Sequence, residues 1–101
     1  MSQITPVPSA YVDLAEKVDI WTAEAYVETL KDLANSGVPQ LIGAQLSAAR
    51  SLRERNLSES SVEALIAFVE KNLRETRAMQ LKDAISWWMD YIAYHQRINP
   101  I

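Results

Sequence analysis

Apolar residues recur every three or four positions along most of this chain, and that spacing predicts amphipathic helices. The first apolar stripe starts after Ser9 and continues almost without interruption to Asn35. Its members are Tyr11, Leu14, Ala15, Val18, Trp21, Thr22, Ala25, Thr29, Leu30 and Leu33. The sequence at residues 19–22 leaves open a bend that would divide this segment into a short and a long helix.

A second helix is predicted from about residue 39 to residue 55, because Gly37 can end the first segment and Pro39 suits a first helical position. One side of this helix is apolar except for one glutamine: Leu41, Ile42, Gln45, Leu46, Ala49 and Leu52. The opposite side is uniformly small: Gly43, Ala44, Ser47, Ala48 and Ser51. Such a face would let a phosphodiester backbone approach the helix closely.

Residues 59–99 contain neither proline nor glycine, yet their apolar pattern changes direction. One stripe consists of Val62, Leu65, Ile66, Val69 and Leu73. After residue 77 a second stripe begins, rotated by about 130° from the first around the helix axis. It consists of Ala78, Leu81, Ile85, Trp88 and Ile92. Either the chain turns near residues 75–78, or one long helix has partners on two sides. We favour the turn, which gives a last helix over about 78–98.

The composition is that of a folded helical domain. Apolar residues make up 49% of the 101 residues and strong helix formers dominate, so we predict an all-α bundle of four to five helices. Residues 1–8 are expected to be an extended lead-in to a single domain over 9–101. No apolar run approaches the ~20 residues that span a bilayer, and no signal peptide is apparent. We therefore expect a cytoplasmic protein without membrane contact.

Few residues of this chain offer catalytic chemistry. There is no cysteine, His95 is the only histidine, and no glycine-rich phosphate loop is present. These absences exclude thiol nucleophiles, cysteine-bound metals and, within one chain, a two-histidine metal site. The sequence predicts no enzyme activity, no cofactor and no metal.

The net charge of −3 divides unevenly along the chain. Residues 1–43 carry six acidic and two basic side chains, whereas residues 44–101 carry seven acidic and eight basic ones. Six of those basic residues form two groups that could contact a nucleic-acid backbone: Arg50, Arg53 and Arg55, then Lys71, Arg74 and Arg77. Basic residues also favour helix carboxyl ends, where they complement the helix dipole. Composition alone favours this second interpretation.

Four large aromatic residues of the last helix also have more than one interpretation. Trp87, Trp88, Tyr91 and Tyr94 could stack on nucleic-acid bases. With Ile85, Met89 and Ile92 between them, they are more typical of a core. Because the rings cover more than one helix face, part of the cluster is also a candidate interface with a partner or a second copy.

Two segments resemble a known family. Residues 84–95, Ala-Ile-Ser-Trp-Trp-Met-Asp-Tyr-Ile-Ala-Tyr-His, resemble the closing helix of the small, all-helical backbone subunit of CRISPR effector complexes. Csm-type members often end in such an aromatic segment with an Ala-Tyr-His element. The Gln45-Leu46 pair, followed by Arg50, Arg53 and Arg55, is similar to that family's second helix. These segments cover about 25 residues, and neither motif is specific to the family.

The resemblance implies a non-catalytic subunit of a Cascade (type I) or type III ribonucleoprotein effector, an antiviral defence complex. Such subunits stack on neighbouring copies and larger subunits, and they bind guide RNA with its target or the displaced strand. Carried onto this chain, the six basic residues become the strand contacts, for RNA-binding or DNA-binding without sequence preference. The aromatic helix becomes packing within or between subunits. The acidic first segment departs from the commonly more basic family. The alternative is a helical adaptor or homo-oligomer that recognises only protein through its aromatic last helix.

Overall fold

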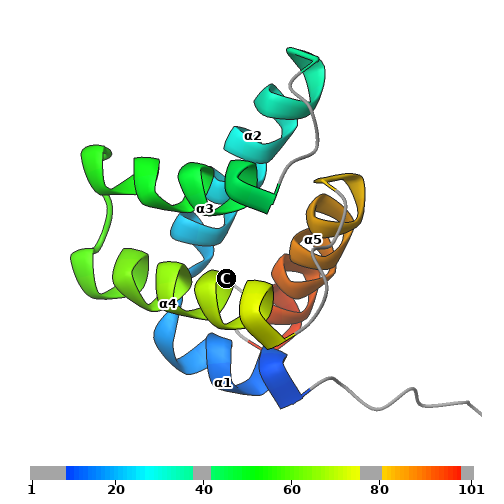
Figure 1. Ribbon diagram of the computed structural model, residues 1–101. Coiled ribbons are helices and arrows are strands. Elements are labelled where there is room, and N and C mark those ends of the chain that lie inside the picture. Colours follow the sequence, from blue (N-terminus) through cyan, green and yellow to red (C-terminus); the bar gives the residue numbers. More distant parts are fainter. Residues whose placement is uncertain (1–8, 38–41, 76–80, 99–101) are drawn as a thin grey trace, which may run out of the picture.

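Five α-helices and one 3₁₀ turn make up the structure, a computed structural model that describes residues 9–37, 42–75 and 81–98 (Figure 1). The elements are α1 (Ser9–Lys17), α2 (Ile20–Asn35), α3 (Ile42–Ser51), the 3₁₀ turn η1 (Leu52–Glu54), α4 (Glu59–Glu75) and α5 (Leu81–Ile98). The described residues contain no strand. The predicted all-α bundle of four to five helices is therefore confirmed.

The bend left open by the sequence is present. Asp19 is extended between α1 and α2, and its carboxylate caps α2 by accepting a 2.8 Å hydrogen bond from the Thr22 N–H. The buried side of α2 includes Tyr26 and Val27 beside Thr22, Ala25 and Leu30 of the predicted stripe. Trp21, which the sequence pattern placed in the apolar stripe, is instead 65% exposed.

Residues 59–99 form two helices rather than one, as we favoured from the change of stripe. Helix α4 ends at Glu75 and α5 begins at Leu81. The expected turn at 75–78 falls largely within residues 76–80, which lie outside the described part of the chain. The predicted start of the second helix at Pro39 also lies outside it, and the described helix α3 begins at Ile42.

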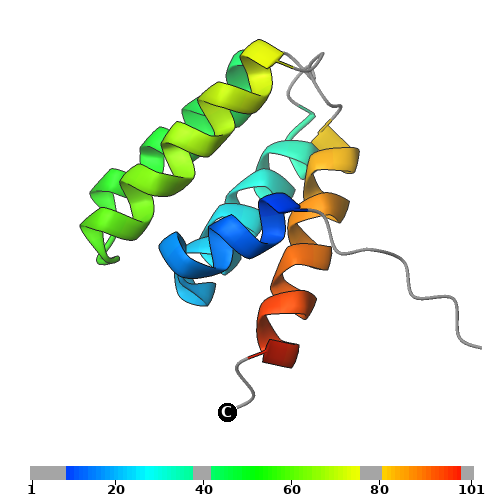
Figure 2. The ribbon, with the colours of Figure 1, turned by 90° about the horizontal axis from the view of Figure 1, so that it is seen from below.

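The helices form two antiparallel pairs with α1 across one end. Figures 1 and 2 show α3 and α4 as a hairpin on one side and α2 beside α5 on the other. Helix α1 packs against α4 and α5, and α2 also contacts α3 and α4. One face of the α2–α5 pair packs against one face of the α3–α4 pair, and the core lies between them.

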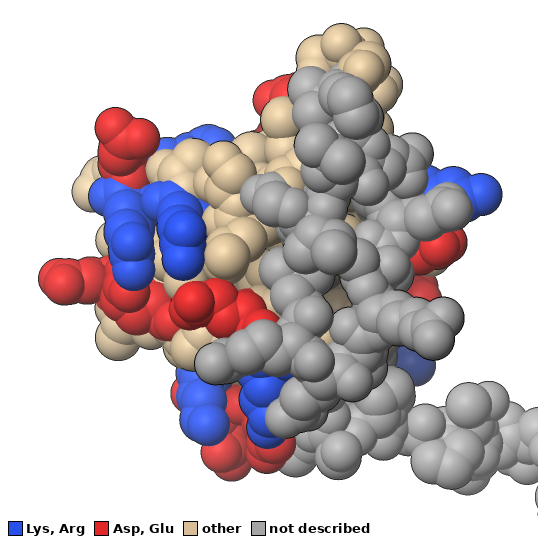
Figure 3. All heavy atoms as spheres, in the orientation of Figure 1, with Lys and Arg blue, Asp and Glu red and all other residues tan. Residues whose placement is uncertain are grey.

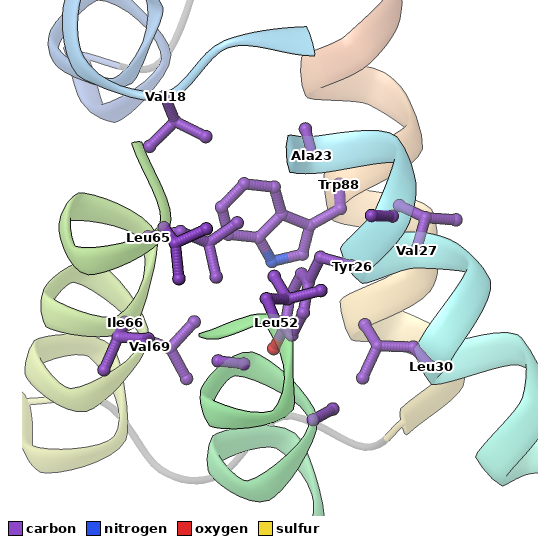
Figure 4. Close-up of a cluster of buried hydrophobic side chains, with 14 of the residues drawn as sticks. Val18, Ala23, Tyr26, Val27, Leu30, Leu52, Leu65, Ile66, Val69 and Trp88 are labelled. Atoms are coloured by element: carbon purple, nitrogen blue, oxygen red, sulfur yellow. The ribbon is translucent and has the colours of Figure 1, made fainter. Parts of the chain in front are cut away.

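Aromatic rings occupy the centre of that core (Figure 4). Tyr26 is fully buried and meets Trp88 edge to face, with ring centroids 5.2 Å apart. Trp88 makes further edge-to-face contacts with Phe68 of α4 at 5.7 Å and with Tyr91 at 5.6 Å. This geometry places the positive edge of one ring on the negative face of another, which stabilises the contact beyond burial alone.

Two long-range hydrogen bonds fix the corner between α1 and α2. The Tyr91 hydroxyl donates to the Val18 carbonyl at 2.9 Å, and the Asp19 N–H donates to the Ser61 hydroxyl at 2.8 Å. Burial, with a smaller contribution from the Asp19 charge, raises the pKa of Tyr91, so this phenol stays a neutral donor. Helices α4 and α5 therefore determine where α1 turns into α2.

Candidate nucleic-acid interface

Three of the predicted strand contacts lie together at the end of the α3–α4 hairpin where the chain passes from one helix to the other. Arg50 is in the last turn of α3, Arg53 is in η1, and Arg55 follows in extended backbone. The Arg55 N–H donates to the Leu52 carbonyl at 3.0 Å, which closes this turn. All three arginine side chains are exposed.

Arg53 is engaged by a carboxylate of the neighbouring helix. Its Nε donates to Oε2 of Glu63 at 2.7 Å and its Nη2 donates to Oε1 at 2.8 Å, a two-pronged ion pair. These hydrogen bonds raise the pKa of Arg53 and hold the pKa of Glu63 below its ordinary value.

Arg50 also faces a carboxylate. Its Nη2 lies 3.6 Å from Oε2 of Glu70 on α4, with both side chains about half exposed. Two of the three arginines at this end of the hairpin are therefore partly neutralised within the chain. A phosphate could contact either arginine only by displacing or joining a glutamate.

Arg55 differs from the other two because its side chain has no ion pair or hydrogen bond to any described residue. It borders a hollow of about 440 Å³ at the end of the hairpin. The hollow is lined by Leu52, Arg53, Arg55, Leu57, Glu59, Val62 and Glu63. Its two carboxylates balance its two guanidinium groups, so the hollow is not a strongly cationic site.

The second predicted basic group lies elsewhere. Lys71 is exposed on α4, roughly 18 Å along the helix axis from Glu59. The structure describes Arg74 only by its place in α4, and Arg77 lies outside the described residues. Since α4 runs back along α3, Lys71 is at the opposite end of the hairpin from Arg55 (Figure 1). Lys71 directly follows Glu70, the carboxylate partner of Arg50, so an acidic side chain lies between the described residues of the two groups.

Acidic residues are interspersed with the basic ones over this side of the molecule. Figure 3 shows red and blue side chains intermingled over α3 and α4, without a continuous basic surface. Four exposed or partly exposed glutamates match the four described cations there: Glu54, Glu59, Glu63 and Glu70. Phosphate binding depends on net neutralisation by cations, so only weak attraction is expected from this surface.

The small face predicted on α3 is only partly available. Ala48 is 3% exposed and belongs to the core, and its carbonyl accepts a hydrogen bond from the Ser51 hydroxyl. Ser47 and Ser51 are exposed. The expectation of an open, uniformly small face is therefore wrong at Ala48, because α3 turns that side partly toward the bundle.

The aromatic cluster of α5 is mainly core. Trp88 and Tyr91 are buried, so their faces cannot stack on bases in this fold. Trp87 is half-buried and stacks on Phe68 at 5.4 Å, and Tyr94 packs against the core with part of its surface exposed. An interface through this helix therefore cannot use Trp88 or Tyr91.

The sequence did not point to the exposed apolar side chains or to the ion-pair partners. Trp21 and Met89 are the large hydrophobic residues exposed in the described part of the chain. Glu63 and Glu70 are ten and twenty positions from their arginines, and only the register of the α3–α4 hairpin makes them neighbours. No local spacing rule gives that register.

Within the described residues, no group of three or more histidine, cysteine or acidic side chains is placed to hold a metal ion. No helix described here has the length and apolar character needed to cross a membrane. Comparisons with protein-family models, curated proteins and solved structures found no match. The described residues form a bundle of five helices with an aromatic core, and the surface of α3 and α4 carries both acidic and basic side chains.

Proposed function

We propose that this chain is a non-catalytic small subunit of a CRISPR ribonucleoprotein effector, with weak contacts to a nucleic-acid backbone. The exposed group of Arg50, Arg53 and Arg55 at one end of the hairpin carries the proposal, beside the resemblance of α3 and α5 to that family. The subunit would act in the cytoplasm beside neighbouring copies and larger subunits. Guide RNA and a target or displaced strand would be its nucleic-acid partners.

The ion pairs at this end are compatible with the proposal because they are exposed. An exposed ion pair contributes little net stability, since both charges are well hydrated when apart. A phosphate can therefore replace Glu63 or Glu70 as the partner of an arginine at small cost. With no more than three such contacts, we expect weak binding to single strands. The logarithm of the binding constant should fall with the logarithm of the salt concentration with a slope of about −2.

The test uses fluorescence anisotropy with a labelled, mixed-sequence single-stranded RNA and a guide–target duplex. The double variant Glu63→Gln and Glu70→Gln removes both competing carboxylates, so its affinity should rise about tenfold. The matched control, Asp13→Asn and Glu16→Gln, makes the same change in net charge on α1. It should raise the affinity far less, because neither residue pairs with an arginine of the hairpin.

The complementary variant replaces Arg50, Arg53 and Arg55 by glutamine. It should abolish the remaining affinity while the helical circular dichroism stays unchanged, because all three side chains are exposed. If the native chain and the Glu63→Gln, Glu70→Gln variant both fail to bind RNA or duplex, the nucleic-acid assignment is wrong.

A second candidate function is a helical adaptor that binds only protein. It is favoured by the balanced charge around the arginines and by the exposure of Trp21 and Met89. Trp88, which the sequence suggested as an interface residue, is only 4% exposed and cannot serve as its probe. The adaptor function predicts no RNA affinity in any of the variants above, and loss of a protein partner on substitution of Trp21 or Met89.

A further inference from the structure

A groove runs between α2 and α5, on different helices from the arginines. It measures about 430 Å³ and is lined by Glu24, Val27, Glu28, Lys31, Met89 and Ile92. Val27 and Ile92 pack with the core, while Met89 is 47% exposed. The groove therefore has an apolar floor, one apolar wall on α5 and one charged wall on α2.

Exposed apolar surface is concentrated beside this groove. Met89 lines it, and Trp21 lies three positions before Glu24 on α2, which places the indole on the same side of that helix. Within the described residues these two are the large hydrophobic side chains left open to water. An exposed apolar patch with a polar rim is typical of a protein interaction site.

The charged wall indicates the chemistry of the occupant. Glu24 and Glu28 are exposed and one helical turn apart, and neither has an ion pair or hydrogen bond to another described residue. Like charges at this spacing repel each other and destabilise a helix. Arg50 and Arg53 of the hairpin, by contrast, have Glu70 and Glu63 as partners. The α2 carboxylates are therefore free to pair with cations from outside the chain.

We propose that the α2–α5 groove binds an amphipathic helix of a partner protein, with two basic residues one turn apart beside its apolar stripe. Its basic residues would pair with Glu24 and Glu28. Its apolar side chains would cover Met89, Ile92 and Trp21. Two packed helices commonly hold a third in this way, with anchors at three- and four-residue spacing. Lys31 sets the direction in which the partner helix runs. An acidic residue of that helix, one turn beyond its two basic residues, would face Lys31.

A second copy of the chain fits the groove less well. If this face met itself, each copy would present two acidic side chains and one basic side chain, Glu24, Glu28 and Lys31, to the same three side chains of the other copy. That like-charge contact is unfavourable. The proposal does not rest on the nucleic-acid function, because the groove and the hairpin arginines lie on different helices.

The probe is an alanine-based helical peptide of four turns, with a leucine stripe and two lysines one turn apart beside it. A second peptide has glutamates in place of the two lysines. Calorimetric titration up to millimolar peptide should show the native chain binding the lysine peptide at least about tenfold more tightly. NMR shifts at the Met89 methyl and the Trp21 indole should follow the same titration.

The variant Glu24→Lys with Glu28→Lys should reverse this preference and bind the glutamate peptide. The control, Asp13→Lys with Glu16→Lys, makes the same charge change on exposed positions of α1 and should keep the native preference. Circular dichroism of both variants checks that the helices persist. The NMR titration uses the native chain, so its result does not depend on whether a variant folds.

Three results would overturn the proposal. The first is that neither peptide binds the native chain. The second is that the α1 control loses the preference as fully as the α2 variant, which would indicate diffuse charge rather than a groove. The third is sedimentation showing a native dimer that Met89→Lys dissociates, which would make a second copy the occupant.

Discussion

Buried rings join the α2–α5 pair to the rest of the bundle, whereas two exposed ion pairs lie on the surface of the α3–α4 hairpin. Tyr26, Trp88 and Tyr91 lose nearly all contact with water, and burying rings of this size contributes much of a small domain's stability. Arg53 and Glu63 keep about half of their side-chain surface in water. The difference separates residues that fix the fold from residues that are free to exchange partners.

The largest expected effect is at the ring cluster. Trp88→Ala should lower the free energy of unfolding by about 3–5 kcal/mol, because it leaves a cavity among Tyr26, Phe68 and Tyr91. Urea unfolding followed by circular dichroism measures this loss. The matched control is Trp21→Ala, which removes the same ring from an exposed site and should change stability by about 0.5 kcal/mol or less. Equal losses would contradict the assignment of the core.

A smaller effect is expected where α5 holds the α1–α2 corner. Tyr91→Phe keeps the ring but removes the donor to the Val18 carbonyl, which should cost about 1–2 kcal/mol because that carbonyl is left without its partner. Thermal unfolding of the native chain and the variant measures the difference. An unchanged midpoint would show that the hydrogen bond does not stabilise the corner.

The smallest effect belongs to the hairpin ion pair, and it should depend on pH. Arg53 holds the pKa of Glu63 below its ordinary 4.5, so the pair stabilises the fold above that pH. The contribution is lost as pH falls through the lowered pKa of the folded state. Arg53→Gln should therefore lower the melting temperature slightly at neutral pH, and less so in acid. If the difference in melting temperature between the native chain and the variant stays constant down to about pH 3, the ion pair is not its cause.

The sequence predicts the helices well because each depends on local patterns. Apolar spacing and the change of stripe after residue 77 were enough to separate α4 from α5. The same spacing misplaced Trp21, because the buried side of α2 passes through Thr22 instead, and the spacing fits either residue.

The candidate site was less predictable, because its properties depend on neighbours from another helix. Local spacing identified Arg50, Arg53 and Arg55 as a group. It did not reveal that Glu63 and Glu70 would face two of them, since that follows from the register of α4 against α3. Likewise, adjacent Trp87 and Trp88 both contact Phe68 of α4, but Trp88 also meets Tyr26 of α2 and alone of the two is buried. Local spacing does not reveal that difference.

The hydrogen bond from Tyr91 to Val18 also has a consequence for the order of folding. Its two residues are 73 positions apart, so the α1–α2 corner acquires this partner only after almost the whole chain has been synthesised and α5 has docked. Before that, the junction has the Asp19 cap and the hydrogen bond from the Asp19 N–H to Ser61 of α4. A nascent chain that stops before α5 would therefore hold this corner through α4 alone, and α5 would complete the beginning of the fold.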